Sequence, residues 1–159
     1  MSEHAIPLEE FDYEMDATRR LLERVPTEKG EWKPHEKSFP LGHLAQLVSW
    51  MPGWIASALT EDAFDIASAP EYSFEPTDTL LAELDRNVAA ARAGLESVTG
   101  EALAETWSLM FGEMEAFSAP RGAAARNHLS HLIHHRGQLT VYLRLVDVPL
   151  PKIYGPTAD

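Results

Sequence analysis

The sequence predicts an all-α fold, a four-helix bundle in which a long crossover connection joins two of the helices. Four segments carry apolar residues at spacings of three and four, the pattern of a helix with one buried face. No strand-like alternation separates these segments, so helices are expected to pack on helices. Two connections, residues 26–37 and 62–76, are longer than the turns of a simple up-and-down bundle, which favours at least one crossover.

The first predicted helix has apolar positions separated by charged residues: Leu8, Phe11, Met15, Thr18, Leu22 and Val25. The second begins after Ser38, a capping residue, with Pro40 suited to its first turn. Its apolar face continues to Leu59. Within it, Pro52-Gly53 predicts a kink or a break.

The third predicted helix starts near Thr77, a suitable N-cap, and ends before Gly100. The fourth covers about 120–146, beyond which prolines prevent further helix. Residues 107–117, which lie between these helices, contain a glycine and are expected to form a short hairpin or an irregular loop. The tail, residues 148–159, is rich in proline, which predicts an extended segment lying against the surface.

Size and composition predict one soluble, cytoplasmic domain covering residues 1–159. The chain has 45% apolar and 24% charged residues, the balance of a globular protein. A net charge of -12 repels phosphate backbones and argues against nucleic-acid binding. The apolar stretches are too short to span a membrane. A small-molecule substrate is the expected partner, and the absence of cysteine excludes a thiolate ligand or nucleophile of the chain's own.

Histidines provide the main functional signal. The chain has seven, and four of them, His128, His131, His134 and His135, are clustered in the fourth helix. On a helical wheel, His131 and His135 fall within the apolar arc of this helix, whereas His134 lies on its flank. Residues four apart on a helix have Cβ atoms about 5–6 Å apart, so these two imidazoles can share a metal ion.

A complete metal site needs a third ligand from another helix. His43, at the start of the second helix, lies at the edge of that helix's apolar face and is the expected third ligand. Two alternatives stay open. His128 also faces inward and can replace His131, and the pair can equally be core histidines bonded to backbone or carboxylate groups. The other histidines are expected at the surface or behind the ligands: His4, His35 and His134.

Inspection excludes two other metal motifs. No Glu stands three residues before a His, so the di-iron carboxylate motif of ferritin-like bundles is missing. His35-Glu36 is not followed by a second His at the zincin spacing. Three neutral imidazoles leave at least one coordination position open, as in catalytic metal sites. Nitrogen ligands favour nickel, copper or zinc over magnesium or calcium.

Three stretches of the chain are distinctive: HLIHHRGQLTVYLR at residues 131–144, KSFPLGHLA at 37–45 followed by PGW at 52–54, and the tail VPLPKIYGP at 148–156. Together they resemble the DinB family of bacterial damage-inducible and YfiT-like proteins. The resemblance spans the whole chain, and the His-x-x-x-His-Arg-Gly-Gln run is its most specific part.

The resemblance implies a four-helix bundle with a long crossover, often assembled as a homodimer. It also implies a metal, nickel or zinc, held by one histidine of the second helix and two of the last. These positions match His43, His131 and His135 here, the same three residues that the helical wheel selects.

The resemblance also implies a class of chemistry. Some relatives transfer the thiols bacillithiol or mycothiol, and one branch isomerises maleylpyruvate with a thiol cofactor. The leading hypothesis is therefore metal-assisted transfer of a low-molecular-weight thiol cosubstrate to an electrophile. The alternatives are a metal-binding stress-response protein without turnover and a hydrolase that uses metal-bound hydroxide.

The sequence assigns no catalytic residue. Gln138 and Tyr142 are candidates for the lining of a pocket. Glu113 or Glu115 is a candidate base, although packing or a solvated surface is the favoured interpretation for each of these four residues. Arg136 lies away from the ligand face, where helix packing or a dimer contact is expected.

Overall fold

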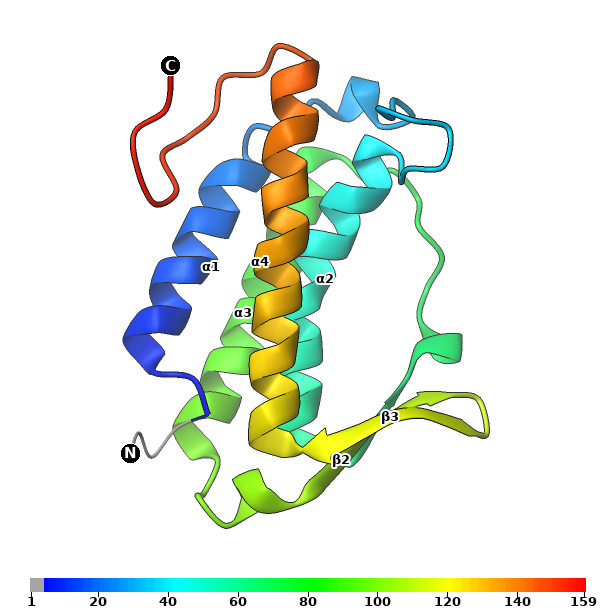
Figure 1. The fold of residues 1–159 in the computed structure, drawn as a ribbon, viewed down its shortest axis with the longest axis vertical. Coiled ribbons are helices and arrows are strands. Elements are labelled where there is room, and N and C mark those ends of the chain that lie inside the picture. Colours follow the sequence, from blue (N-terminus) through cyan, green and yellow to red (C-terminus); the bar gives the residue numbers. More distant parts are fainter. Residues whose placement is uncertain (1–4) are drawn as a thin grey trace.

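The computed structural model describes residues 5–159. Four α-helices form the body of the described chain (Figure 1). Their bounds are α1 (Leu8–Leu22), α2 (Leu41–Thr60), α3 (Thr77–Ser97) and α4 (Arg121–Leu145). All four predicted helices are confirmed, although α1 ends earlier than its pattern indicated. Among the helices of residues 5–159, none is long and apolar enough to cross a membrane.

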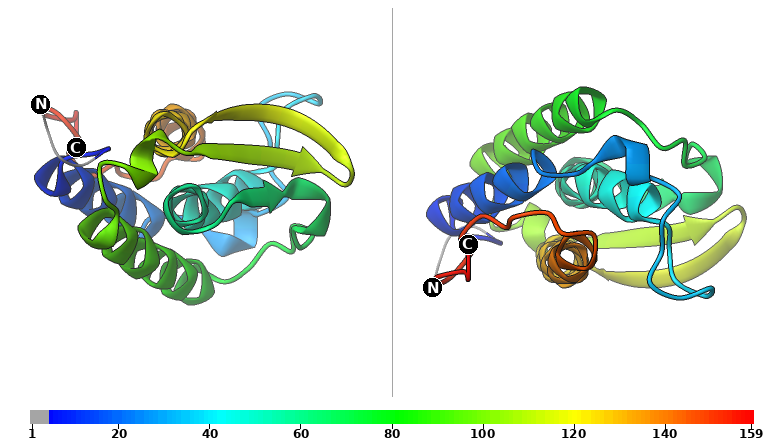
Figure 2. Two further views of the ribbon diagram at one scale, coloured as in Figure 1. Left: turned by 90° about the horizontal axis from the view of Figure 1, so that it is seen from below. Right: turned by 90° about the horizontal axis from the view of Figure 1, so that it is seen from above.

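The helices do not simply alternate in direction. In Figure 1, α1 and α4 run upward, whereas α2 and α3 both run downward. Residues 61–76, between α2 and α3, therefore return along the length of the bundle, and this is the crossover that the long connection predicted. The end-on views show α2 beside both α3 and α4, with α1 against α3 (Figure 2).

A three-stranded sheet accompanies the bundle, so the prediction of an all-α fold is confirmed only in part. β2 (Thr106–Phe111) and β3 (Met114–Pro120) form an antiparallel hairpin, the first of the two forms expected for this segment. β1 (Ala63–Asp65), within the crossover, pairs in parallel with β2. The sequence does not reveal β1, because three residues are too few to show an alternation.

Asp65 joins the crossover to the tip of the hairpin. Its Oδ1 accepts hydrogen bonds from the backbone N–H groups of Ala67 and Gly112, each at 2.9 Å. Gly112 has a φ of 60°, a conformation that residues with a Cβ rarely adopt. The crossover and the hairpin are therefore tied together, and both contact the bundle at the end where α2 finishes and α4 begins (Figure 1).

Two groups of buried side chains fill the bundle, and every helix contributes to both. The group at the hairpin end includes Phe11, Met15, Met51, Ile55, Ala91, Leu95, Trp107, Leu129 and Leu132. The group at the opposite end includes Leu21, Leu44, Val48, Leu84, Leu139 and Leu143. Full burial of one large apolar side chain contributes about 1.5–3 kcal/mol. These two groups therefore provide the main stabilisation of the helix arrangement.

Two helix details bear on the predictions. α2 continues through Pro52 without a break. Asn87 of α3 donates to the carbonyl oxygen of Ser49 (Nδ2–O 3.0 Å), which supplies a partner in the turn that proline disturbs. Thr77 is not an N-cap, because its hydroxyl donates to the carbonyl oxygen of Val25 (2.9 Å). Its side chain joins the start of α3 to Val25, which lies beyond the end of α1.

Arg136 connects α4 to α1 and to the C-terminal tail. Its guanidinium is 2% exposed and forms an ion pair with Glu14, which is also buried (Nη2–Oε2 2.6 Å). It also donates to the hydroxyls of Thr18 (3.2 Å) and Tyr154 (2.6 Å). The Tyr154 hydroxyl lies 2.9 Å from both carboxylate oxygens of Glu14. The packing role expected for Arg136 is therefore confirmed, and the tail, predicted to lie against the surface, contacts α1.

Replacing Arg136 by methionine is expected to lower the free energy of unfolding by about 3–5 kcal/mol, because the Glu14 carboxylate then stays buried without its cation. Urea denaturation measures this loss. The double variant Arg136→Met/Glu14→Met is the matched control and should recover much of it, since neither charge remains. Equal stability of wild type and Arg136→Met would contradict this account of the ion pair.

Candidate metal centre and adjacent cavity

His131 and His135 lie one turn apart on α4, and their rings meet. Their Nε2 atoms are 2.9 Å apart and their ring centroids 4.6 Å apart. His135 is buried, whereas His131 is exposed to solvent. The structure thus brings together the two histidines that the spacing of four selected, and it leaves one of them accessible to small molecules.

Gln138 fixes the orientation of the His135 ring. Its Oε1 lies 2.8 Å from Nδ1 of His135, one turn further along α4. An amide oxygen only accepts hydrogen bonds, so Nδ1 carries the proton and Nε2 is left with its lone pair. This lone pair points at Nε2 of His131. Gln138, predicted as a pocket-lining residue, therefore orients the candidate ligand His135 through a hydrogen bond.

His43 lies in the first turn of α2 between two aromatic rings. Its ring stacks on Phe39 (centroids 4.3 Å apart) and on Tyr72 of the crossover (3.4 Å). Phe39 also approaches His135, with 6.3 Å between ring centroids. His43 is therefore held near His135, but within residues 5–159 no three His, Asp or Glu side chains are arranged so that they could hold a metal ion.

The three candidate ligands are neutral at physiological pH. Burial is the main cause that lowers the pKa of His43, His131 and His135. A nearby imidazole adds to this, since His135 lowers the pKa of both His43 and His131. For His135, the hydrogen bond to Gln138 opposes the effect of burial. Neutral imidazole is the form that coordinates metal ions.

His128, the alternative to His131, lies deeper in the protein. It is 5% exposed and contacts Trp107 and Trp54 edge-on, with ring centroids 5.1 and 5.9 Å apart. Neither of its ring nitrogens has a hydrogen-bond partner within residues 5–159. Burial, assisted by His131, lowers the pKa of His128 to about 4. His128 is therefore a neutral core residue, and it does not pair with His135.

A cavity of about 320 Å³ opens beside His131. Its walls come from α2, the crossover, the hairpin and α4. The lining residues are Trp54, Phe64, Ile66, Leu109, Phe117, Asn127, His128 and His131. Since His131 also meets His135, the cavity and the histidine pair share one side chain. This shared residue places an apolar compartment directly beside the candidate metal centre.

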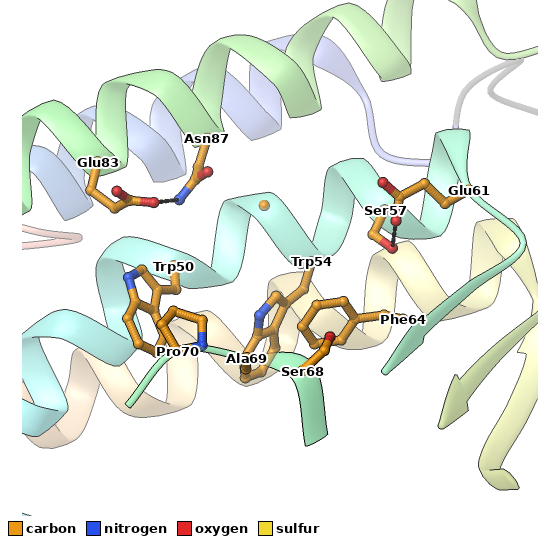
Figure 3. A pocket seen from close by; sticks show the side chains of 11 residues that line it. Trp50, Trp54, Ser57, Glu61, Phe64, Ser68, Ala69, Pro70, Glu83 and Asn87 are labelled. Carbon is orange, nitrogen blue, oxygen red and sulfur yellow. Dashed lines mark hydrogen bonds between the residues drawn. The ribbon is translucent and has the colours of Figure 1, made fainter. Parts of the chain in front are cut away.

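A second cavity, of about 280 Å³, lies between α2, α3 and the crossover (Figure 3). Trp54 and Phe64 line both cavities and separate them. The second cavity carries two carboxylates, and each has a hydrogen-bond partner. Glu61 accepts from Ser57 (2.7 Å), and Glu83 accepts from Asn87 (3.2 Å), as the dashed lines in Figure 3 mark. This compartment therefore carries carboxylates, whereas the lining of the cavity beside His131 has none.

The structure does not bring the other predicted pocket residues to the histidine pair. Tyr142 packs edge-on against Trp32, with ring centroids 5.8 Å apart. Glu113 lies in the exposed turn of the hairpin, and Glu115 accepts a hydrogen bond from Ser108 across the two strands (2.8 Å). None of the three lines the cavity beside His131. Their expected roles as lining or base have no support in this geometry.

The family model of the DinB superfamily matches residues 10–139. The chain belongs to the DinB superfamily. A curated relative in this comparison is the uncharacterized protein YrdA of Bacillus subtilis (strain 168), 28% identical over 156 residues that cover 96% of this chain and 88% of YrdA. The family resemblance inferred from the sequence is thus confirmed.

Solved structures of DinB-like proteins share the fold. One from Bacillus subtilis, YjoA, superposes with a TM-score of 0.70 at 20% identity and covers 94% of this chain and 98% of its own. Another, from Bacillus cereus ATCC 10987, gives a TM-score of 0.68 at 21% identity, covering 92% and 95% of the two chains. At this identity the likeness establishes the architecture of the DinB-superfamily chain.

The buried His128 of this DinB-superfamily protein predicts acid sensitivity. Its pKa falls from 6.5 to about 4 on folding, so the unfolded chain takes up the proton first. The stabilisation is complete above pH 6.5 and is lost as the pH falls towards 4, by about 3 kcal/mol. Urea denaturation of the metal-free protein at several pH values should show a weaker pH dependence for His128→Phe than for wild type. An identical dependence in both proteins would contradict the assignment.

Proposed function

We propose that this DinB-superfamily protein binds one divalent metal ion through His43, His131 and His135 and uses it to transfer a low-molecular-weight thiol to an electrophile. The observation that carries the proposal is the meeting of two neutral imidazoles, Nε2 to Nε2, beside a cavity. The family resemblance supports the choice of thiol transfer among the reactions that such a centre supports.

The imidazole donors suit a metal such as nickel or zinc by their chemistry. A bound ion would be held by ring nitrogens that lie close together. The 2.9 Å between Nε2 of His131 and Nε2 of His135 suits such sharing. Imidazole nitrogen favours nickel, copper and zinc over magnesium or calcium. His43, whose stacking partner Phe39 also approaches His135, is the proposed third ligand.

A bound ion of this kind lowers the pKa of a coordinated thiol or water. The chain's own residues supply position and access. Gln138 keeps the lone pair of His135 directed at the centre, and Phe39 and Tyr72 hold the ring of His43. In the transfer, the thiol sulfur forms a bond to the electrophilic carbon while the leaving group departs with its bonding electrons. The thiol proton passes to solvent, which reaches the exposed His131.

Replacing His135 by alanine is expected to abolish both metal binding and thiol conjugation, because it removes the ligand that meets His131. Elemental analysis after loading with Ni²⁺ or Zn²⁺ measures the metal, and fluorescence with monochlorobimane and several thiols measures conjugation. Ser130→Ala, an exposed change on the same helix, is the control and should behave as wild type. Circular dichroism checks that both variants fold.

The same experiment separates the alternative functions. Wild-type protein that binds metal but conjugates no thiol above background would contradict the transferase and favour a metal-binding stress-response protein. Metal-dependent cleavage of ester substrates, without conjugation, would favour a hydrolase. A protein that binds neither metal would overturn the metal centre itself.

Gln138→Leu is expected to weaken metal binding about 10–100-fold, because a ligand histidine without its orienting partner loses the required tautomer and ring angle. Gln138→Glu should keep most of the affinity, since a carboxylate also accepts from Nδ1 of His135. Competition with a coloured chelator measures both affinities. Equal affinities for wild type and Gln138→Leu would show that the hydrogen bond to His135 has no role in binding.

A further inference from the structure

We propose that the cavity beside His131 binds the apolar aromatic part of an uncharged electrophilic substrate. This inference rests on the proposed function, because it names the substrate class for the same centre. Four properties of the cavity carry it: its size, its aromatic walls, the absence of charge in its lining, and the side chain that it shares with the histidine pair.

The size suits a small ring system. A volume of about 320 Å³ lies at the lower end of the range of ligand pockets, which is about 300–1,000 Å³. An apolar cavity of about 150 Å³ takes up benzene. The cavity therefore has room for one or two fused rings with a short substituent, and a bulky polar cosubstrate does not fit inside it.

Aromatic side chains from three separate elements form the walls. Trp54 comes from α2, Phe64 from β1 and Phe117 from β3. The rings of Trp54 and Phe64 are 6.0 Å apart between centroids and tilted by 35°, so they do not close the space by flat stacking on each other. Aromatic rings prefer offset and edge-to-face neighbours, which an inserted ring finds on several sides here.

The lining excludes charged groups. Among the described residues that line the cavity, none is Asp, Glu, Lys or Arg, and Asn127 is the polar residue besides the two histidines. A carboxylate or ammonium group taken inside loses its water without gaining a partner, which is strongly unfavourable. The cavity across Trp54 and Phe64 differs, because it holds Glu61 and Glu83 (Figure 3). The cavity beside His131 is therefore expected to bind an uncharged ring in preference to a charged one.

His131 places the cavity next to the proposed reaction centre, because it lines the cavity and also contacts His135. Its ring lies 6.0 Å from that of Trp54, and its Nε2 lies 2.9 Å from Nε2 of His135. A ring held against Trp54 is thus kept next to the centre that activates the thiol. Such positioning converts an encounter of two solutes into a reaction between neighbouring groups. The covalent step is the one given above, in which sulfur bonds to carbon and the leaving group departs.

Calorimetric titration with 1-naphthol and 1-naphthoate tests the inference on metal-free protein, where no ion attracts the carboxylate. Wild type is expected to bind 1-naphthol at least about tenfold more tightly than 1-naphthoate, because the charged group is not matched inside the cavity. Absence of 1-naphthol binding, or equal affinity for the two compounds, overturns the inference.

Two variants locate the binding. Leu109→Trp fills the cavity and should weaken 1-naphthol binding at least about tenfold, which corresponds to about 1.4 kcal/mol. Met114→Trp introduces the same side chain at an exposed position of the same hairpin and should bind as wild type. If Leu109→Trp does not fold, Phe117→Ser decides, since Phe117 lies half-exposed at the cavity. Unchanged affinity in the folded cavity variants overturns the inference.

Binding of the aromatic probe in the other cavity, which holds Glu61 and Glu83, would contradict the inference. If 1-naphthylmethylammonium binds more tightly than 1-naphthol, and Glu83→Gln abolishes that binding, the aromatic site lies across Trp54 and the inference is wrong.

Failure of the proposed function is distinguished by His135→Ala, which should lose metal and conjugation but bind 1-naphthol as wild type. Conjugation that persists in Leu109→Trp with unchanged substrate preference would instead leave the transferase standing and reject the cavity.

Discussion

The parallel course of α2 and α3 is the constraint on which the rest of the molecule depends. Because both helices run in the same direction, residues 61–76 must retrace the length of the bundle before α3 begins. Along this return, Phe64 lies next to Trp54, and Tyr72 stacks on the ring of His43. A short antiparallel turn between the two helices would leave neither residue there. Both cavities and one face of the candidate metal centre thus follow from the topology of a single connection.

α4 separates structural and chemical tasks onto different faces. His131, His135 and Gln138 meet on one face, while Arg136 points to α1 and the tail, where the buried Glu14 holds it. A helix anchored by a buried ion pair on one side presents its other side chains in a fixed register. Imidazoles that must share one ion need such a fixed spacing, because coordination tolerates little displacement.

Local periodicity was enough to predict the helices and the meeting of His131 with His135, because both depend on residues within one turn of each other. Features built from distant segments were not predictable in the same way. β1 gains its identity from pairing with β2, Tyr72 reaches His43 through the crossover, and Arg136 finds Glu14 on another helix. Gln138 was within reach of the same reasoning, since its spacing of three from His135 permits the observed hydrogen bond.

The position of His131 on the boundary between the paired imidazoles and the apolar cavity has a thermodynamic consequence. In the proposed site, whatever occupies the cavity touches a metal ligand, so the two binding equilibria cannot be independent. Linkage requires reciprocity: if the ion changes the affinity for the ring by some factor, the ring changes the affinity for the ion by that same factor. The imidazole of His131 would then couple retention of the metal ion to binding of the substrate ring, so that the affinity for each would depend on whether the other is bound.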